Sequence, residues 1–118
     1  ETSHMTIEYL NSGEILSQGT ATDTTVYLCG LTGGDTSKDI AGQTRDVLAK
    51  IDKCLAHYGT DKSKLLSAVI YLDDLRRKPA MNEVWKEWLG DLKRPARACI
   101  GVQLEMGTEV EIMVTAAR

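Results

Sequence analysis

The segment at residues 64–72 reads KLLSAVIYL and decides the fold. Apart from Lys64, Ser67 and Tyr71, every residue in it is apolar, which is too continuous for a strand with one face in water. It therefore predicts a central β-strand covered on both faces. It is also the longest apolar stretch and far shorter than the roughly 20 residues that cross a bilayer, so no membrane span is expected.

Amphipathic helices are predicted on both sides of this strand. From Asp39, apolar residues recur at spacings of three, four and seven, and Gly59 ends the pattern. After the strand, Pro79 suits a first helical turn, and a second apolar stripe ends at Gly90. The apolar positions are Ile40, Val47, Leu48, Ile51, Cys54, Leu55 and Tyr58 in the first helix, and Met81, Val84, Trp85, Trp88 and Leu89 in the second.

Short strands are predicted towards both ends of the chain. Three precede the first helix, at residues 6–10, 17–22 and 25–31, and two follow the second, at 97–104 and 109–115. The resulting order is β-β-β-α-β-α-β-β. It predicts an α+β fold in which two helices pack on one face of a six-stranded mixed sheet.

Alternation within the last two strands suggests where chemistry lies. Alternate strand residues share a face, and we expect Ala98, Ile100 and Val102 to face the core. If these strands are neighbours, Arg97 and a glutamate such as Glu111 share the helix-free face. Arginine binds a carboxylate through two parallel hydrogen bonds, and a nearby glutamate is able to hold water. Such a pair is more often a solvated or interface ion pair, so the spacing alone does not establish a site.

Composition narrows the partners. The formal net charge is −3 and the isoelectric point is about 5.3, which argues against nucleic acid or an anionic membrane. Three cysteines without a CxxC spacing favour neither a disulfide framework nor a zinc site, and they fit a reduced cytoplasm. A chain of 118 residues has little room for a deep pocket, so we expect a small-molecule site between subunits.

The first four residues are expected not to belong to the folded domain. Residues 1–4 precede Met5 and carry neither the basic nor the apolar region of a signal peptide. We interpret them as an expression scar, which leaves residues 5–118 as a single domain.

The most specific pattern is RPARACIGV at residues 94–102, followed by Val110-Glu111-Ile112 and a closing Ala116. It resembles the signature of the Rid superfamily (RidA/YjgF), which has a PAR segment, a few strand residues and then VEI ending in alanine. Segments 15–18 and 26–30 resemble two further regions of that family. The chain is identified as a divergent Rid member. The resemblance implies a chorismate-mutase-like fold and homotrimers with a pocket at each subunit interface.

The resemblance also implies an activity, the hydrolysis of reactive 2-imino and 2-enamino acids to 2-oxo acids and ammonia, with no metal or organic cofactor. On this view Arg97 clamps the substrate carboxylate and Glu111 positions or activates water. The other residues expected to bind substrate or support the site are Leu16, Cys29, Gly30, Asn82 and Cys99.

Three departures from the family pattern leave the function open. Leu16 stands where many members have tyrosine, Cys29 replaces serine, and Leu104-Glu105 replaces the usual Leu-Pro. The first two make the pocket more apolar, which favours larger or less polar substrates. Besides the general deaminase, the alternatives are a deaminase for an enamine intermediate of a catabolic pathway, and a module that binds a 2-oxo acid or related carboxylate without turnover.

Overall fold

A computed structural model describes residues 5–118, and the predicted expression scar at residues 1–4 lies outside them. The helices and strands follow one another in the predicted order, which is confirmed. The 3-10 helices η1 (Lys62–Lys64) and η2 (Leu75–Arg77) precede β4 and α2. The other elements are β1 (Glu8–Ser12), β2 (Ser17–Ala21), β3 (Thr25–Leu28), α1 (Ile40–His57), β4 (Leu65–Leu72), α2 (Lys78–Leu89), β5 (Ala96–Gly101) and β6 (Val110–Ala117).

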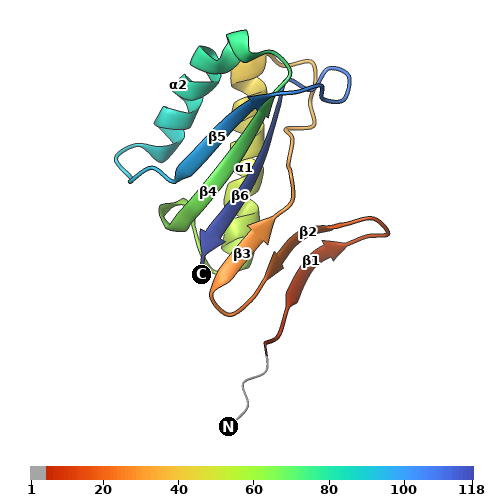
Figure 1. The fold of residues 1–118 in the computed structure, drawn as a ribbon, viewed down its shortest axis with the longest axis vertical. Coiled ribbons are helices and arrows are strands. Elements are labelled where there is room, and N and C mark those ends of the chain that lie inside the picture. Colours follow the sequence, from red (N-terminus) through yellow and green to blue (C-terminus); the bar gives the residue numbers. More distant parts are fainter. Residues whose placement is uncertain (1–4) are drawn as a thin grey trace.

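The strands form one mixed sheet in the order β1-β2-β3-β6-β4-β5 (Figure 1). The C-terminal strand β6 lies between β3 and β4 and is antiparallel to both. Strands β4 and β5 are parallel, and such a pair needs a long crossover, which α2 supplies. The β1–β2 hairpin extends the sheet beyond β3 and away from the helices.

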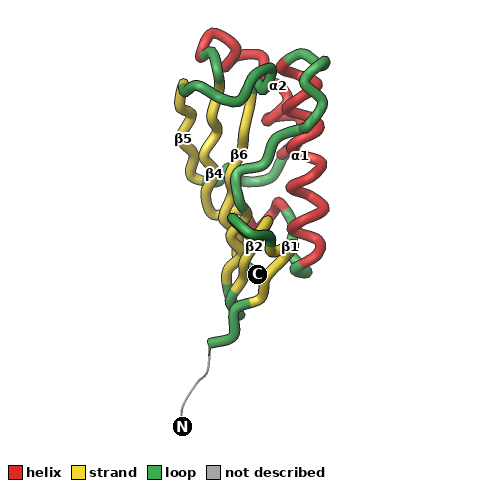
Figure 2. Tube along the Cα trace, turned by 90° about the vertical axis from the view of Figure 1, so that its right-hand side faces the viewer, coloured by secondary structure: helices red, strands yellow, loops and turns green. Residues whose placement is uncertain are grey.

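Both helices pack on the same face of the sheet (Figure 2). Asp39 is the N-cap residue of helix α1, and its side chain accepts a hydrogen bond from the Gly42 amide at 2.9 Å. Gly59 and Gly90 follow the two helices with positive φ, as predicted from the sequence. Neither helix in the described chain combines the length and hydropathy needed to cross a membrane.

Strand β4 is covered on one face, so the prediction that it is covered on both is wrong for the single chain. Its Ala68, Ile70 and Leu72 are buried against the helices. The opposite side, which we call the open face, has no helix over it because α1 and α2 lie on the same side. Apolar side chains from three neighbouring strands lie on this face, with Tyr27, Ile100 and Met113 between 39% and 50% exposed.

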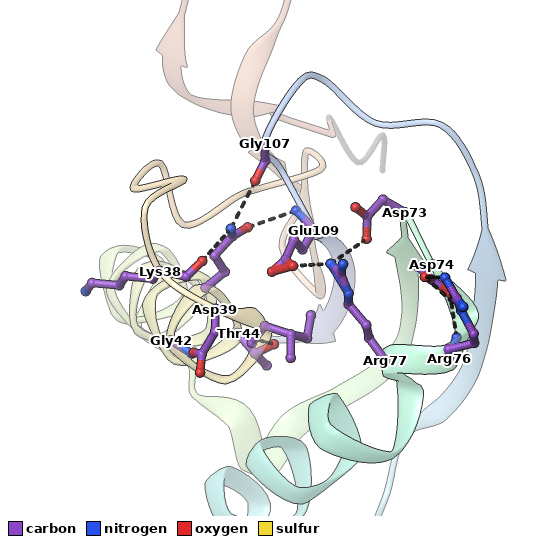
Figure 3. Close-up of polar contacts among 12 residues, drawn as sticks. Lys38, Asp39, Gly42, Thr44, Asp73, Asp74, Arg76, Arg77, Gly107 and Glu109 are labelled. Atoms are coloured by element: carbon purple, nitrogen blue, oxygen red, sulfur yellow. Dashed lines mark hydrogen bonds and ion pairs between the residues drawn. The ribbon is translucent and has the colours of Figure 1, made fainter.

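A buried glutamine fixes the loop that leads into β6. Gln43 is 3% exposed, and its Nε2 donates to the carbonyl oxygens of Lys38 and Gly107, both at 3.0 Å. Its Oε1 accepts from the Glu109 amide at 2.9 Å (Figure 3). The Glu109 carboxylate also forms an ion pair with Arg77. The start of β6 is therefore held by α1 on one side and by η2 on the other.

We predict that Gln43→Leu lowers the free energy of unfolding by about 3 kcal/mol, because it leaves a buried amide and two carbonyls without their partner. Guanidinium unfolding followed by tryptophan fluorescence measures the change. The matched control is Gln103→Leu in the same loop, where the side chain is exposed, and its effect stays within about 0.5 kcal/mol. Equal stabilities of the two variants would contradict the role of Gln43.

Candidate functional site

Arg97 lies in a preorganised setting between β5 and α2. Its Nη1 donates to Asn82 Oδ1 at 2.8 Å, and its guanidinium carbon lies 5.5 Å from the centre of the Trp85 ring. The amide and the ring face hold the guanidinium while leaving part of its donor fork for an anion. These residues line a surface cleft of about 550 Å³, and its walls are Pro79, Asn82, Glu83, Trp85, Lys86, Arg94, Pro95 and Arg97.

The side of the sheet on which Arg97 lies differs from the prediction. Its register partner on β4 is the buried Ala68, so Arg97 points towards the helices. Ile100 pairs instead with Tyr71 and is 44% exposed on the open face. The expectation that Ala98, Ile100 and Val102 face the core is therefore wrong. The physical reason is that α2 offers Arg97 a ring face and an amide, which compensate a partly buried cation.

Glu111 lies on the open face of β6, opposite Tyr71 of β4. It lines a second cavity, of about 220 Å³, together with Gly30, Thr32, Glu105 and Thr108. The segment after β3 is held beside Glu111 by two hydrogen bonds between Leu31 and Ile112, both at 2.9 Å.

Gly30 makes close contact with Glu111 possible. A Cβ atom at position 30 would overlap Glu111 Oε2 and would lie 3.1 Å from the Glu111 Cδ atom. The φ of Gly30 is not in the left-handed region, so a side chain here would be opposed only by the Glu111 carboxylate, which would have to shift. Gly30 and Glu111, both predicted from the sequence as site residues, are thus adjacent.

The two cysteines predicted to line the pocket lie in different places. Cys99 is half-buried on the helix side of β5, on the same face as Arg97. Cys29 follows β3 and donates its backbone amide to the Gln18 carbonyl at 2.9 Å. Burial raises the pKa of the Cys29 thiol, and the negative charge of Glu111 raises it further. The Cys29 side chain is thus a neutral thiol at physiological pH.

Leu16 joins neither group of residues. It is 58% exposed, just before β2 in the β1–β2 hairpin. It is not among the residues that line the cavity of Arg97 or the cavity of Glu111.

The predicted site residues therefore fall into two groups on opposite faces of the sheet. Arg97, Asn82 and Cys99 face the helices, whereas Glu111 and Gly30 lie at the cavity on the other side. Strand β4 separates β5 from β6. The expectation that Arg97 and a glutamate share the helix-free face assumed that the last two strands are neighbours. They are not, and Arg97 points towards the helices, so the expectation is wrong.

Several lining residues were missed from the sequence. Trp85 was assigned to the core, where it is indeed 5% exposed, but it also supports the Arg97 guanidinium. Asn82, Trp85 and Lys86 are spaced i, i+3 and i+4 on α2, which places them on one helix face. This spacing was the sequence signal that could have identified Trp85 and Lys86 as lining residues. Nothing in the local sequence marked Glu105 or Thr108, which reach the cavity of Glu111 through the course of their loop.

The described residues offer few metal ligands. No group of three or more His, Cys, Asp or Glu side chains within residues 5–118 is arranged to hold a metal ion. The groups that the two cavities do offer are a guanidinium suited to an anion on one side, and two carboxylates with two threonines on the other.

The sheet, the helices and these two cavities define a small α+β protein with an arginine in one cavity and two glutamates in the other. A family model described as Endoribonuclease L-PSP matches residues 7–118. The chain therefore belongs to this family, which is the YjgF/Rid family, and the resemblance found in the sequence is confirmed.

Known relatives and a solved structure agree with this assignment. A RutC family protein of Haemophilus ducreyi is 42% identical over 92 residues, covering 77% of this chain and 79% of its own. The 3-aminoacrylate deaminase RutC of Acinetobacter baylyi is 34% identical over 91 residues, covering 72% and 71%. A crystal structure of a YjgF family member from Neisseria meningitidis superposes with a TM-score of 0.93 at 38% identity, covering 98% of each chain. The predicted fold class is confirmed.

We predict that Gly30→Ala displaces the Glu111 carboxylate from its cavity, because the added methyl group overlaps it. The overlapping atom is the end of a flexible side chain that is able to move, so we expect the free energy of unfolding to fall by at most about 1 kcal/mol. A crystal structure of the variant and a denaturant titration test both effects. In the control Gly13→Ala, the nearest atom to the new Cβ is the Leu16 carbonyl oxygen at 3.6 Å, so neither effect is expected. An unmoved Glu111 in Gly30→Ala would refute the steric argument.

Proposed function

We propose that this protein is an enamine/imine deaminase that hydrolyses reactive 2-imino and 2-enamino acids to 2-oxo acids and ammonia. The observation that carries the proposal is the Arg97 guanidinium held by Asn82 and Trp85 at the wall of an open cleft. A fork fixed in this way suits a substrate carboxylate. Membership of a family with a relative named as a deaminase supports the same assignment.

The proposed reaction needs orientation more than activation. Arg97 binds the carboxylate, and Glu111 holds a water molecule that adds to the electrophilic C2 of the imine. The carbinolamine formed loses ammonia when the nitrogen takes up a proton, and the oxygen of water remains as the 2-oxo group. An enamino acid first takes a proton at C3 to give the imine. Water is the co-reactant, and no electrons are exchanged, so this reaction calls for no redox cofactor.

We further propose that the working unit is a homotrimer in which each site is shared by two copies. Arg97 and Glu111 occupy opposite faces of one sheet, so a second copy is needed for both to touch one small substrate. The apolar open face, with Tyr27, Ile100 and Met113 exposed, supports such an association. In this arrangement Arg97 comes from one copy and Glu111 from the next, and Leu16 of the exposed hairpin is available at the contact.

A cytoplasmic location fits the same proposal. Cys29, Cys54 and Cys99 are all free thiols, as expected in a reducing compartment. The acidic net charge gives no reason to expect nucleic acid as a partner. The proposed partners are thus a small 2-imino acid and further copies of this chain.

A second candidate is a deaminase devoted to one enamine intermediate of a catabolic pathway. The relative from Acinetobacter baylyi is named for 3-aminoacrylate, a small enamino acid. Leu16 and Cys29 in place of more polar residues favour a different substrate range from that of archetypal Rid members.

We predict that Arg97→Ala lowers kcat/KM for 2-imino acids at least about a hundredfold, since it removes a charge-assisted, bidentate contact. Imino acids generated in situ by an amino acid oxidase are trapped with semicarbazide, and the protein lowers the yield of semicarbazone. The control Lys93→Ala, a loop cation outside the cleft, leaves the rate unchanged. Turnover that survives Arg97→Ala would overturn the role of Arg97. No turnover by the intact protein on imino or enamino acids, combined with 2-oxo acid binding, would favour the non-catalytic module.

Mixing two inactive variants tests whether the site is shared. Arg97→Ala and Glu111→Gln are each inactive, and co-refolding equal amounts should restore about one quarter of the sites in a cyclic assembly. A shared site regains activity because one copy supplies Arg97 and its neighbour supplies Glu111. If both residues act within one copy, the mixture stays inactive. Light scattering on the same sample reports whether the assembly is trimeric.

A further inference from the structure

The cleft beside Arg97 is strongly basic although the chain is acidic. Three of its lining side chains, Lys86, Arg94 and Arg97, are cations, and Glu83 is the one carboxylate among its lining residues. The chain as a whole carries a formal charge of −3. A monocarboxylic substrate needs one cation, which Arg97 provides, so the proposed function leaves Lys86 and Arg94 without a role.

Arg94 is fixed at the wall of the cleft opposite α2. Its Nη1 donates to the carbonyl oxygens of Gly90 and Leu92, at 2.8 and 2.7 Å. These contacts hold the guanidinium in the turn between α2 and β5, three residues before Arg97. They use one of its nitrogens, so the other edge of the guanidinium still has donors for an anion.

Lys86 is a movable cation on the α2 side. It lies one helical turn after Asn82, the residue that holds Arg97, and both side chains line the cleft. Its Nζ lies 2.8 Å from Glu83 Oε1, but the two side chains are 57% and 73% exposed. An ion pair this exposed contributes little stability, so the ammonium group is able to turn to a bound anion.

We propose that the cleft selects substrates with a second anionic group, namely dicarboxylic 2-imino acids and their 2-oxo products. Arg97 binds the carboxylate next to the reacting carbon, and Lys86 and Arg94 bind the distal one. The inference rests on the proposed function for its catalytic part, whereas its binding part stands alone. The sequence predicts larger or less polar substrates because of Leu16 and Cys29. The present inference differs, because those two residues lie outside this cleft.

Binding of two simple acids of equal chain length tests the proposal without turnover. Calorimetric titration of the full-length protein compares glutarate, a dicarboxylate, with pentanoate, a monocarboxylate. We expect glutarate to bind more tightly at low salt, and its advantage to shrink as salt screens the exposed cations. Equal affinities for the two acids would overturn the proposal.

Two variants with the same change of charge test whether the preference for glutarate arises in this cleft. Lys86→Glu should lower the glutarate-to-pentanoate affinity ratio about fivefold or more, the upper range for an exposed ion pair. Lys93→Glu makes the same change of charge outside the cleft and should leave the ratio unchanged. Circular dichroism verifies that both variants fold. A similar loss in both variants would mean that net charge, and not this cleft, controls binding.

Turnover then separates this inference from the proposed function. The imino acids of glutamate and of norvaline, generated by suitable oxidases, are compared in the semicarbazide assay. Both proposals are supported if kcat/KM is higher for the imino acid of glutamate than for that of norvaline, and if this advantage falls in Lys86→Glu. Deamination of both imino acids at equal rates would overturn the substrate class and leave the deaminase intact. Lys86-dependent glutarate binding with no turnover of any imino acid would overturn the deaminase and support the dicarboxylate site.

Discussion

The position of β6 between β3 and β4 is the constraint on which the candidate site depends. In β6 the alternate residues Val110, Ile112 and Val114 face the helices, where they are at most 1% exposed. Glu111 is then forced onto the open face, and the bridge to Leu31 brings Gly30 against it. The same pairing inserts β4 between β5 and β6 and so separates Arg97 from Glu111.

The sequence predicted the elements better than the faces they bury. Both helices follow from the spacing of apolar residues and from the glycines that end them, and these signals are local. Alternation in β5 correctly shows that Ala98 and Ile100 share a face, but alternation alone does not say which face the helices cover. That depends on the register with β4, a long-range property. An apolar row facing open space was therefore taken for core.

The candidate site shows the same division between local and long-range information. Arg97, Glu111, Gly30 and Asn82 were found through short motifs, and the structure explains two of them directly. Asn82 holds the Arg97 guanidinium, and Gly30 leaves room for the Glu111 carboxylate. Trp85 was counted as core because a buried indole on an apolar stripe has no local mark of a second role.

The charges of the two cavities are complementary. The Arg97 cleft carries three cations and one carboxylate, whereas the Glu111 cavity is lined by two carboxylates and no cation among the described residues. In a ring of copies, a basic surface of one copy facing an acidic surface of the next favours a single orientation of association. A 2-imino acid also carries both kinds of group, a carboxylate and, on the adjacent carbon, a basic nitrogen. The arrangement that orients neighbouring copies would thus also orient the substrate.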